Sequence, residues 1–125
     1  MIPRRSGVIL GFGGPGDRSG PLGDYYLGGT QVAFDAIETI RRQLSVEFGP
    51  HGIRFVTLAS GGVPETFPGD FDGAAQITKM IEDQTLLGRA ATLEDIGNAA
   101  VFVASDRARS VTAAIVNVSS GALID

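Results

Sequence analysis

The sequence predicts a single α/β domain built on a parallel sheet. Short apolar runs and helical patterns follow one another in the order strand, helix, strand, helix pair, strand. The apolar runs do not alternate with polar residues, which is typical of strands covered on both faces. Parallel strands need crossover connections, and these are right-handed, so helices are expected on the faces of the sheet. The expected strands are 7–12, 53–59 and 112–118.

The longest predicted element is a helix from Gly29 to Gly49. Its apolar residues recur at the spacing of roughly 3.6 residues per turn and predict one buried face over about five turns. Glu38 and Arg42 form an i,i+4 pair of the favourable polarity. Gly49 is expected to cap the helix, and Pro50 cannot continue it. The expected buried face consists of Val32, Ala33, Ala36, Ile37, Ile40, Leu44 and Phe48.

Two shorter helices are expected in the second half of the chain. The first spans 74–86 on a weak apolar stripe. The second begins at Thr92, whose hydroxyl is a typical N-cap, with Asp95 as the acid of a capping box. The residues expected to be buried are Ala74, Ile77, Met80 and Ile81 in the first helix, and Ile96, Ala99, Ala100 and Val103 in the second.

Composition excludes several classes of function. The 125 residues carry a net charge of −4 and only one lysine, Lys79, which argues against a nucleic-acid surface. With no cysteine and one histidine, neither a disulfide framework nor a thiolate zinc site is expected. No apolar run approaches the roughly 20 residues of a membrane span, and residues 1–5 lack the apolar core of a signal peptide. We therefore expect a cytoplasmic protein without membrane partners.

A G-x-G-x-x-G pattern runs from Gly11 to Gly16, directly after the first expected strand. In a dinucleotide-binding site this pattern opens a helix whose N-terminus faces the phosphates. Here Pro15, Gly20, Pro21 and Gly23 keep the chain non-helical. A glycine-rich loop over 13–28 is favoured over a phosphate site.

This loop follows the carboxyl end of the first strand, where open α/β sheets place their ligands. Tyr25 or Tyr26 could act as an acid there only beside a cation that lowers the phenol pKa, and the closest arginine in sequence is Arg18. A packing role for the tyrosine pair is therefore favoured. The candidate polar residues of the loop are Asp17, Asp24, Tyr25 and Tyr26.

His51 and a group of acids are weaker candidates. His51 has no carboxylate or hydroxyl neighbour in sequence, so a solvated turn residue is favoured over a catalytic base. The acids match no metal-ligand spacing, so a solvated face is favoured and no metal is expected. They are Asp70, Asp72, Glu82 and Asp83.

Two segments resemble the short-chain dehydrogenase/reductase family: EFGPHGIRFVTLASGGVPET at 47–66 and LLGRAATLEDIGNAAVFVASDRARSVTAAIVNVSSGALID at 86–125. The first resembles the helix, turn and strand that follow the active-site helix in that family. The second resembles the Gly-Arg connector, helix, Ala-Ser-Asp turn and final strand at the end of such proteins. The resemblance implies the C-terminal half of a Rossmann-like three-layer fold with about three parallel strands. The outer edge of the first strand, at residues 8–10, would be unpaired.

The resemblance also implies where catalytic residues would stand. The family's serine falls at Gly13-Gly14, and its tyrosine and lysine fall at Thr30 and Phe34, counted back from Glu47 and Gly52. The glycines supply no serine hydroxyl, Thr30 cannot supply a phenol and Phe34 cannot supply an ammonium, so the catalytic triad is absent. The positions implied to contact a cofactor are Gly61, Val63 and Thr66.

Two functions remain open from the sequence. In one, residues 1–125 are a fragment or divergent member of a family of NAD(P)-dependent oxidoreductases, inactive as this chain and binding NAD or NADP only if an N-terminal half is supplied. In the other, they form a non-catalytic binding or oligomerisation module on the same fold. An unpaired strand edge also predicts a homo-oligomer, a dimer or tetramer. The small-molecule substrate is not indicated.

Overall fold

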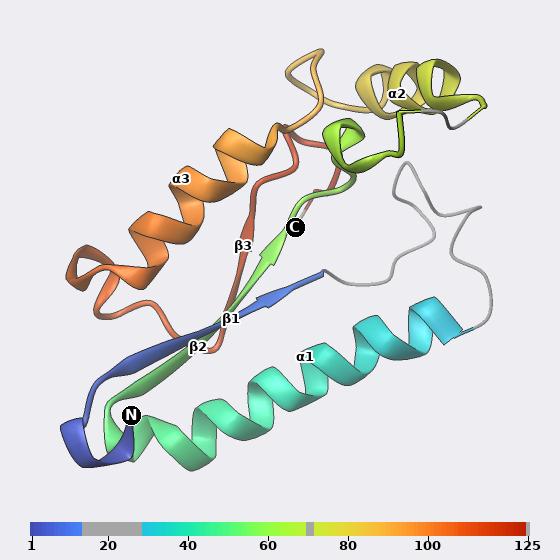
Figure 1. Cartoon of the computed structure of the whole chain (residues 1–125). Helices are drawn as coiled ribbons and strands as arrows, with labels where there is room; N and C mark the ends of the chain where they lie inside the picture. Colours follow the sequence, from blue (N-terminus) through green and yellow to red (C-terminus); the bar gives the residue numbers. More distant parts are fainter. Residues whose placement is uncertain (14–28, 70–71, 125) are drawn as a thin grey trace.

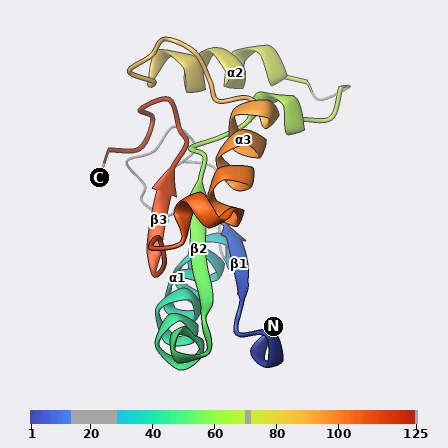
Figure 2. The same ribbon diagram turned by 90° about the vertical axis from the view of Figure 1, so that its left-hand side faces the viewer.

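The structure, a computed structural model, describes residues 1–13, 29–69 and 72–124. It is a three-stranded parallel sheet with a long helix on one face and a shorter helix on the other (Figures 1 and 2). The strands, in sheet order, are β1 (Gly7–Phe12), β2 (Ile53–Ala59) and β3 (Ala114–Asn117). The helices are α1 (Gly29–Phe48), α2 (Ala74–Asp83) and α3 (Leu93–Ala104). The predicted α/β class and parallel order are confirmed.

The register of the sheet runs without interruption from Gly7 opposite Ile53 to Phe12 opposite Leu58. The strand predicted over 112–118 is shorter because its entry is irregular. Ala113 adopts a left-handed φ of 55°, and its N–H donates to the Phe55 carbonyl at 2.8 Å. The Phe55 N–H donates to the Thr112 hydroxyl, at 3.1 Å, rather than to a backbone carbonyl of the last strand.

The prediction of strands buried on both faces holds for β2 and fails for the other two. β2 is buried throughout except for the half-buried Arg54. β1 and β3 are half-buried because each is a sheet edge, and Phe12 is 60% exposed. Among the described residues β1 pairs with β2 alone, so its outer edge is open as expected.

The apolar core lies between α3 and the sheet. Val56, Leu58 and Val103 are its fully buried centre. Burying each such side chain contributes about 1.5–3 kcal/mol relative to exposure. The half-buried residues packed around this centre are Val8, Leu10, Ile96, Ala100, Val111 and Val116.

The predicted buried face of α1 is only partly correct. Ile37, Leu44 and Phe48 are half-buried against the sheet, whereas Val32 and Ile40 are 68% and 48% exposed. The helix is rotated so that a more polar stripe faces the strands. The members of the predicted face that are exposed are Val32, Ala33, Ala36 and Ile40.

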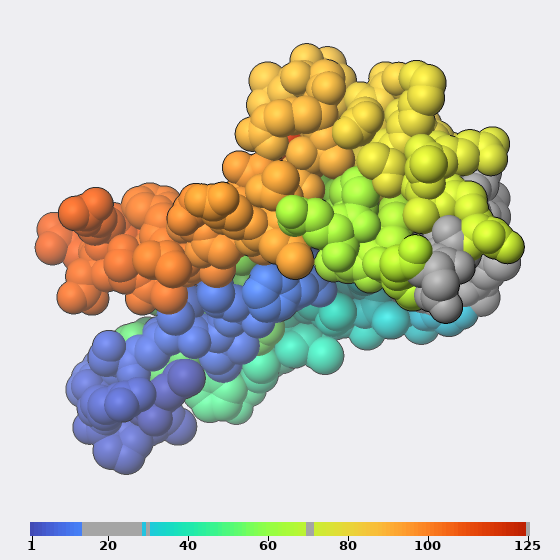
Figure 3. Space-filling view, turned by 45° about the horizontal axis from the view of Figure 1, so that its top comes forward, coloured from blue at the N-terminus to red at the C-terminus, as the bar shows by residue number. Residues whose placement is uncertain are grey.

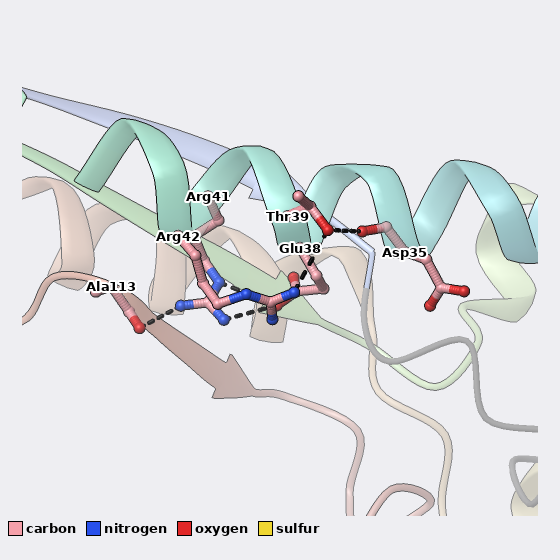
Figure 4. Close-up of polar contacts among 6 residues, drawn as sticks. All are labelled: Asp35, Glu38, Thr39, Arg41, Arg42 and Ala113. Atoms are coloured by element: carbon pink, nitrogen blue, oxygen red, sulfur yellow. Dashed lines mark hydrogen bonds and ion pairs between the residues drawn. The ribbon is translucent and has the colours of Figure 1, made fainter. Parts of the chain in front are cut away.

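A buried ion pair explains this rotation. Glu38 and Arg41 are each 6% exposed, and the Glu38 Oε2 accepts from Arg41 Nε at 3.0 Å and Nη2 at 2.8 Å. Arg41 Nη1 also donates to the carbonyl of Ala113 at the entry to β3 (Figure 4). The predicted Glu38–Arg42 pair is therefore wrong, and Arg42 instead reaches the Thr39 hydroxyl at 3.4 Å.

The end of α1 also differs from the prediction, because Gly49 does not cap it. A 3₁₀ turn, Gly49–His51, continues from the helix and ends at Gly52, whose φ is 73°. A Cβ on Gly52 would lie 2.2 Å from the Arg5 carbonyl oxygen. Glycine is required here both by the left-handed backbone and by the close approach of the N-terminal segment.

The two shorter helices follow the sequence closely. The capping box is formed: the Asp95 N–H donates to the Thr92 hydroxyl and the Thr92 N–H donates to the Asp95 carboxylate, each at 3.0 Å. α2 ends at Asp83 rather than at 86. The residues expected to be buried are half-buried or buried in both helices, with Ile81 and Val103 the most enclosed.

Candidate functional site

The carboxyl ends of the three strands meet below α2 (Figure 1). The Gly13 N–H donates to the Leu58 carbonyl at 3.1 Å, and the Val118 N–H donates to the Ala59 carbonyl at 2.7 Å. Both bonds extend the strand ladder by one residue. Open α/β sheets bind ligands beyond this end, so the loops that leave it form the candidate site.

The loop after β2 contains the residues expected to contact a cofactor. Gly61 has a φ of 68°, and a Cβ on it would lie 3.0 Å from the Cβ atoms of Ser119 and Ala122. Glycine therefore lets this loop pack against the segment after β3. Val63 is 8% exposed, and the Thr66 hydroxyl donates to its carbonyl at 2.7 Å. The structure brings the three residues together; their contact with a cofactor remains a prediction.

The implied catalytic positions lie at the other side of this end. Phe34 on α1 lies against Gly13, because a Cβ on that glycine would be 3.3 Å from Cδ1 of the ring. Thr30 lies in the first turn of α1. Gly14 lies outside the described residues. An aromatic ring thus stands where the resemblance implies a lysine.

A hollow of about 540 Å³ opens beside the last strand. Its wall combines the connector before α3 with the turn after β3. Arg89 Nη1 donates to the Asp95 carboxylate at 2.7 Å, and this bond, with those from Thr92, lowers the pKa of Asp95 to about 2. The lining residues are Leu86, Leu87, Arg89, Ala91, Asp95, Asn117, Val118, Ser119, Ser120 and Gly121.

Two polar arrangements here were not predicted. The Glu65 carboxylate accepts from the Leu93 N–H at 2.5 Å, which ties the loop after β2 to the first turn of α3. Asn117 donates to the Leu123 carbonyl at 2.8 Å, while the buried Ser119 hydroxyl accepts from the Leu123 N–H at 3.0 Å. The bond between Glu65 and Leu93 is favourable because an acid lies near the positive end of the helix dipole. Sequence does not reveal it, because the two residues are 28 positions apart.

The remaining candidates do not join this site. His51 lies in the turn before β2, at the opposite end of the sheet. Asp83 pairs with Lys79 at 2.8 Å, and no group of three metal-ligating side chains occurs within 1–13, 29–69 and 72–124. Lying outside those ranges are Gly14, Gly16, Asp17, Asp24, Tyr25, Tyr26 and Asp70.

A family model described as enoyl-(acyl carrier protein) reductase matches residues 28–122. The chain belongs to the short-chain dehydrogenase/reductase family. The resemblance and the Rossmann-like fold expected from it are confirmed.

Relatives in this family are reductases and dehydrogenases. Enoyl-(acyl-carrier-protein) reductase (NADH) FabI of Bacillus cereus is 34% identical over 108 residues, covering 77% of this chain and 41% of the relative. The inactive 2-(S)-hydroxypropyl-CoM dehydrogenase 2 of Xanthobacter autotrophicus is 30% identical over 127 residues, covering 97% of this chain and 53% of the relative. The chain thus spans about half, or less, of these relatives.

Solved structures agree with this relationship. FabI from Candidatus Liberibacter asiaticus superposes with a TM-score of 0.80 at 25% identity, over 94% of this chain and 45% of that one. A short-chain dehydrogenase/reductase from Burkholderia thailandensis has a TM-score of 0.78 at 26% identity, over 98% of this chain and 47% of that one. Across the described residues, no helix is both long and apolar enough to span a bilayer.

Proposed function

We propose that this chain is the C-terminal part of an NAD(P)-dependent short-chain oxidoreductase fold, and that it does not turn over substrate by itself. Its loop after β2 would lie against the nicotinamide end of a dinucleotide, through Gly61, Val63 and Thr66. The relatives' names support the cofactor class, since the Bacillus cereus reductase is named for NADH. The strands that would bind the rest of the nucleotide belong to the N-terminal part of the family fold.

The observation that carries this proposal is a surface open to a partner, made of the outer edge of β1 and the adjoining apolar flank of α1. This surface is called the seam. On a helical projection, Ala33, Ala36 and Ile40 lie on one side of Ile37, and Glu38 and Arg41 lie on the other. The polar side reaches toward β3, as the Arg41 contact with Ala113 shows. The apolar flank therefore lies toward the outer edge of β1.

The seam combines two surfaces that a partner would cover. Among the described residues, the outer edge of β1 carries backbone N–H and C=O groups that pair with no strand. On the apolar flank of α1, the Ile40 side chain is 48% exposed. An open edge next to exposed apolar side chains is a template for another strand and helix. The relatives are about twice this length, and we infer that their N-terminal part supplies the further strands.

The seam can be tested by supplying that part separately. The N-terminal half of the Bacillus cereus reductase, tagged, is co-expressed with this chain and purified through the tag. We expect the two to co-purify at equal stoichiometry. Ile40→Glu places a charge in the seam and should abolish co-purification, whereas Val46→Glu, on a site 78% exposed and pointing away from the sheet, should not. A folded chain that does not co-purify, or equal behaviour of the two variants, refutes the seam.

The same seam supports self-association of the chain alone. We propose a homo-oligomer, a dimer or tetramer, in which copies cover each other's β1 edge and α1 flank. Light scattering at micromolar concentration should give at least twice the mass of the chain, and Ile40→Glu should shift it to the monomer. A monomeric unaltered chain contradicts this assembly.

A further inference from the structure

The opposite end of the sheet carries a second hollow, of about 430 Å³. It lies between the start of β1, the turn before β2 and the residues after α3. In Figure 3 it opens between the orange end of α3 and the blue start of the chain. Being at the amino end of the strands, it is separate from the candidate site described above.

Arg54 forms one wall of this hollow with a half-buried guanidinium. Its Nη2 donates to the carbonyls of Val103 at 2.8 Å and Ser105 at 3.3 Å, and its Nη1 donates to the Val111 carbonyl at 3.1 Å. No carboxylate among the described residues pairs with it. Arg54 is therefore a fixed, partly desolvated cation without a counterion, and such a charge attracts an anion.

Arg109 supplies a second cation to the same hollow. It is exposed, and within the described part of the chain its side chain makes no hydrogen bond or ion pair. The Thr112 hydroxyl on the wall accepts from the Phe55 N–H and keeps its own hydrogen free to donate. Among the described residues, Asp106 is the one acid that lines the hollow.

The surroundings strengthen the positive potential. Arg5 lies at the adjoining turn, where its Nη2 donates to the Pro50 carbonyl at 2.8 Å. The chain as a whole is acidic, at a net charge of −4, so this end contrasts with the rest. Half of its ten basic residues lie at or beside this end: Arg4, Arg5, Arg54, Arg107 and Arg109.

We propose that the hollow binds a compact oxyanion, the phosphate group of a small phosphoester, between Arg54 and Arg109. The guanidinium of Arg109 makes no bond within the described part of the chain and can match two oxygens of a phosphate, and charge-assisted bonds of this type are stronger than neutral ones. Arg54, whose Nη atoms already donate to three carbonyls, contributes mainly a fixed positive charge, so little side-chain freedom is lost when an anion binds. The Thr112 hydroxyl donates to a further phosphate oxygen, and the negative charge of Asp106 weakens phosphate binding.

The experiment titrates inorganic phosphate into the full chain by calorimetry, with chloride holding the ionic strength constant. Arg109→Gln should weaken binding about tenfold, the size expected for a lost hydrogen bond between charged groups. Arg107→Gln removes the same charge from the neighbouring turn outside the hollow and should change affinity less than about twofold. Asp106→Asn should tighten binding severalfold.

Three results would overturn the site. The first is no heat of binding from the folded chain at millimolar phosphate. The second is an equal loss for Arg109→Gln and Arg107→Gln, which would mean general attraction to a basic surface. The third is an Asp106→Asn variant that binds no more tightly. Because this hollow lies away from the seam and the cofactor loop, its failure leaves the proposed function untouched.

Discussion

The Phe34 ring on α1 closes against Gly13, the first residue beyond β1: a Cβ on the glycine would lie 3.3 Å from ring atom Cδ1. The family resemblance implies that this helix position would carry the cation that lowers a tyrosine pKa. A phenyl ring cannot supply that charge, and its contact with Gly13 is apolar packing. Phe34 therefore cannot play the role that the resemblance implies for its position.

Restoring the implied catalytic residues should not produce activity in this chain. The variant Gly14→Ser, Thr30→Tyr, Phe34→Lys regains a hydroxyl, a phenol and an ammonium, but hydride transfer still requires a bound nucleotide. We expect no NAD(P)H oxidation, followed by absorbance at saturating nucleotide with a short enoyl thioester. The Bacillus cereus reductase in the same assay is the positive control. Turnover by the triple variant would show that this chain holds a nucleotide by itself.

The buried Glu38–Arg41 pair should matter far more than its exposed neighbour. Arg41→Met leaves the Glu38 carboxylate buried without its partner and frees the Ala113 carbonyl, so we expect a loss of about 3 kcal/mol in the free energy of unfolding. Arg42→Met, one residue along on the exposed face, should change it by less than about 0.5 kcal/mol. Urea denaturation measures both. Equal effects would show that the pair does not hold β3 to α1.

Stability at the start of α3 should fall in acid. Arg89, then the Thr92 bonds, lower the pKa of the folded Asp95 carboxyl to about 2, below the value of about 3.9 for an unfolded aspartate. A lowered folded pKa gives stability that is complete above about pH 4 and is lost as pH falls toward 2. The protection of amides in the first turn of α3, measured as exchange relative to the intrinsic rate at each pH, should therefore fall between these values.

Two variants separate this effect from general acid unfolding. Asp95→Asn should lower the protection of this turn already at neutral pH and should abolish its further fall in acid. Glu94→Gln, at the neighbouring position, makes no capping bond and should retain it. If both variants keep the full acid response, Asp95 is not its source.

Gly61 should tolerate no side chain, unlike Gly97. Gly61→Ala adds a Cβ at 3.0 Å from those of Ser119 and Ala122 on a backbone with φ of 68°, and should destabilise the chain by about 1–2 kcal/mol. Gly97→Ala fills open space in the middle of α3 and should stabilise it by roughly 0.5–1 kcal/mol. Thermal unfolding gives the sign of each. A neutral Gly61→Ala would mean that the two loops do not pack closely.

The fold was predictable where local sequence decides it. The strands at 7–12 and 53–59 are apolar runs bounded by polar or glycine residues, and the Thr92–Asp95 capping box is a local bond pair. The orientation of α1 could not be predicted from local sequence, because apolar residues occupy two flanks of the helix. What selects the flank is the contact of Arg41 with Ala113, 72 residues away in the chain.

The same distinction applies to the candidate site. Gly61, Val63 and Thr66 lie together because they are close in sequence at the end of one strand, and their contact with a cofactor stays a prediction. The Glu65 bond to the start of α3 and the packing of Gly61 against Ser119 join separate loops. No local pattern encodes either contact, since both depend on how α3 and β3 are placed on β2.

The central claim is tested most directly by titrating NADH into this chain alone and into its complex with the N-terminal half of the Bacillus cereus reductase, following nucleotide fluorescence. We predict no binding by the chain alone and saturable binding by the complex, without turnover. Binding by the chain alone, or a stable folded complex that binds no nucleotide, would contradict the assignment of this chain as the C-terminal part of a dinucleotide-binding fold.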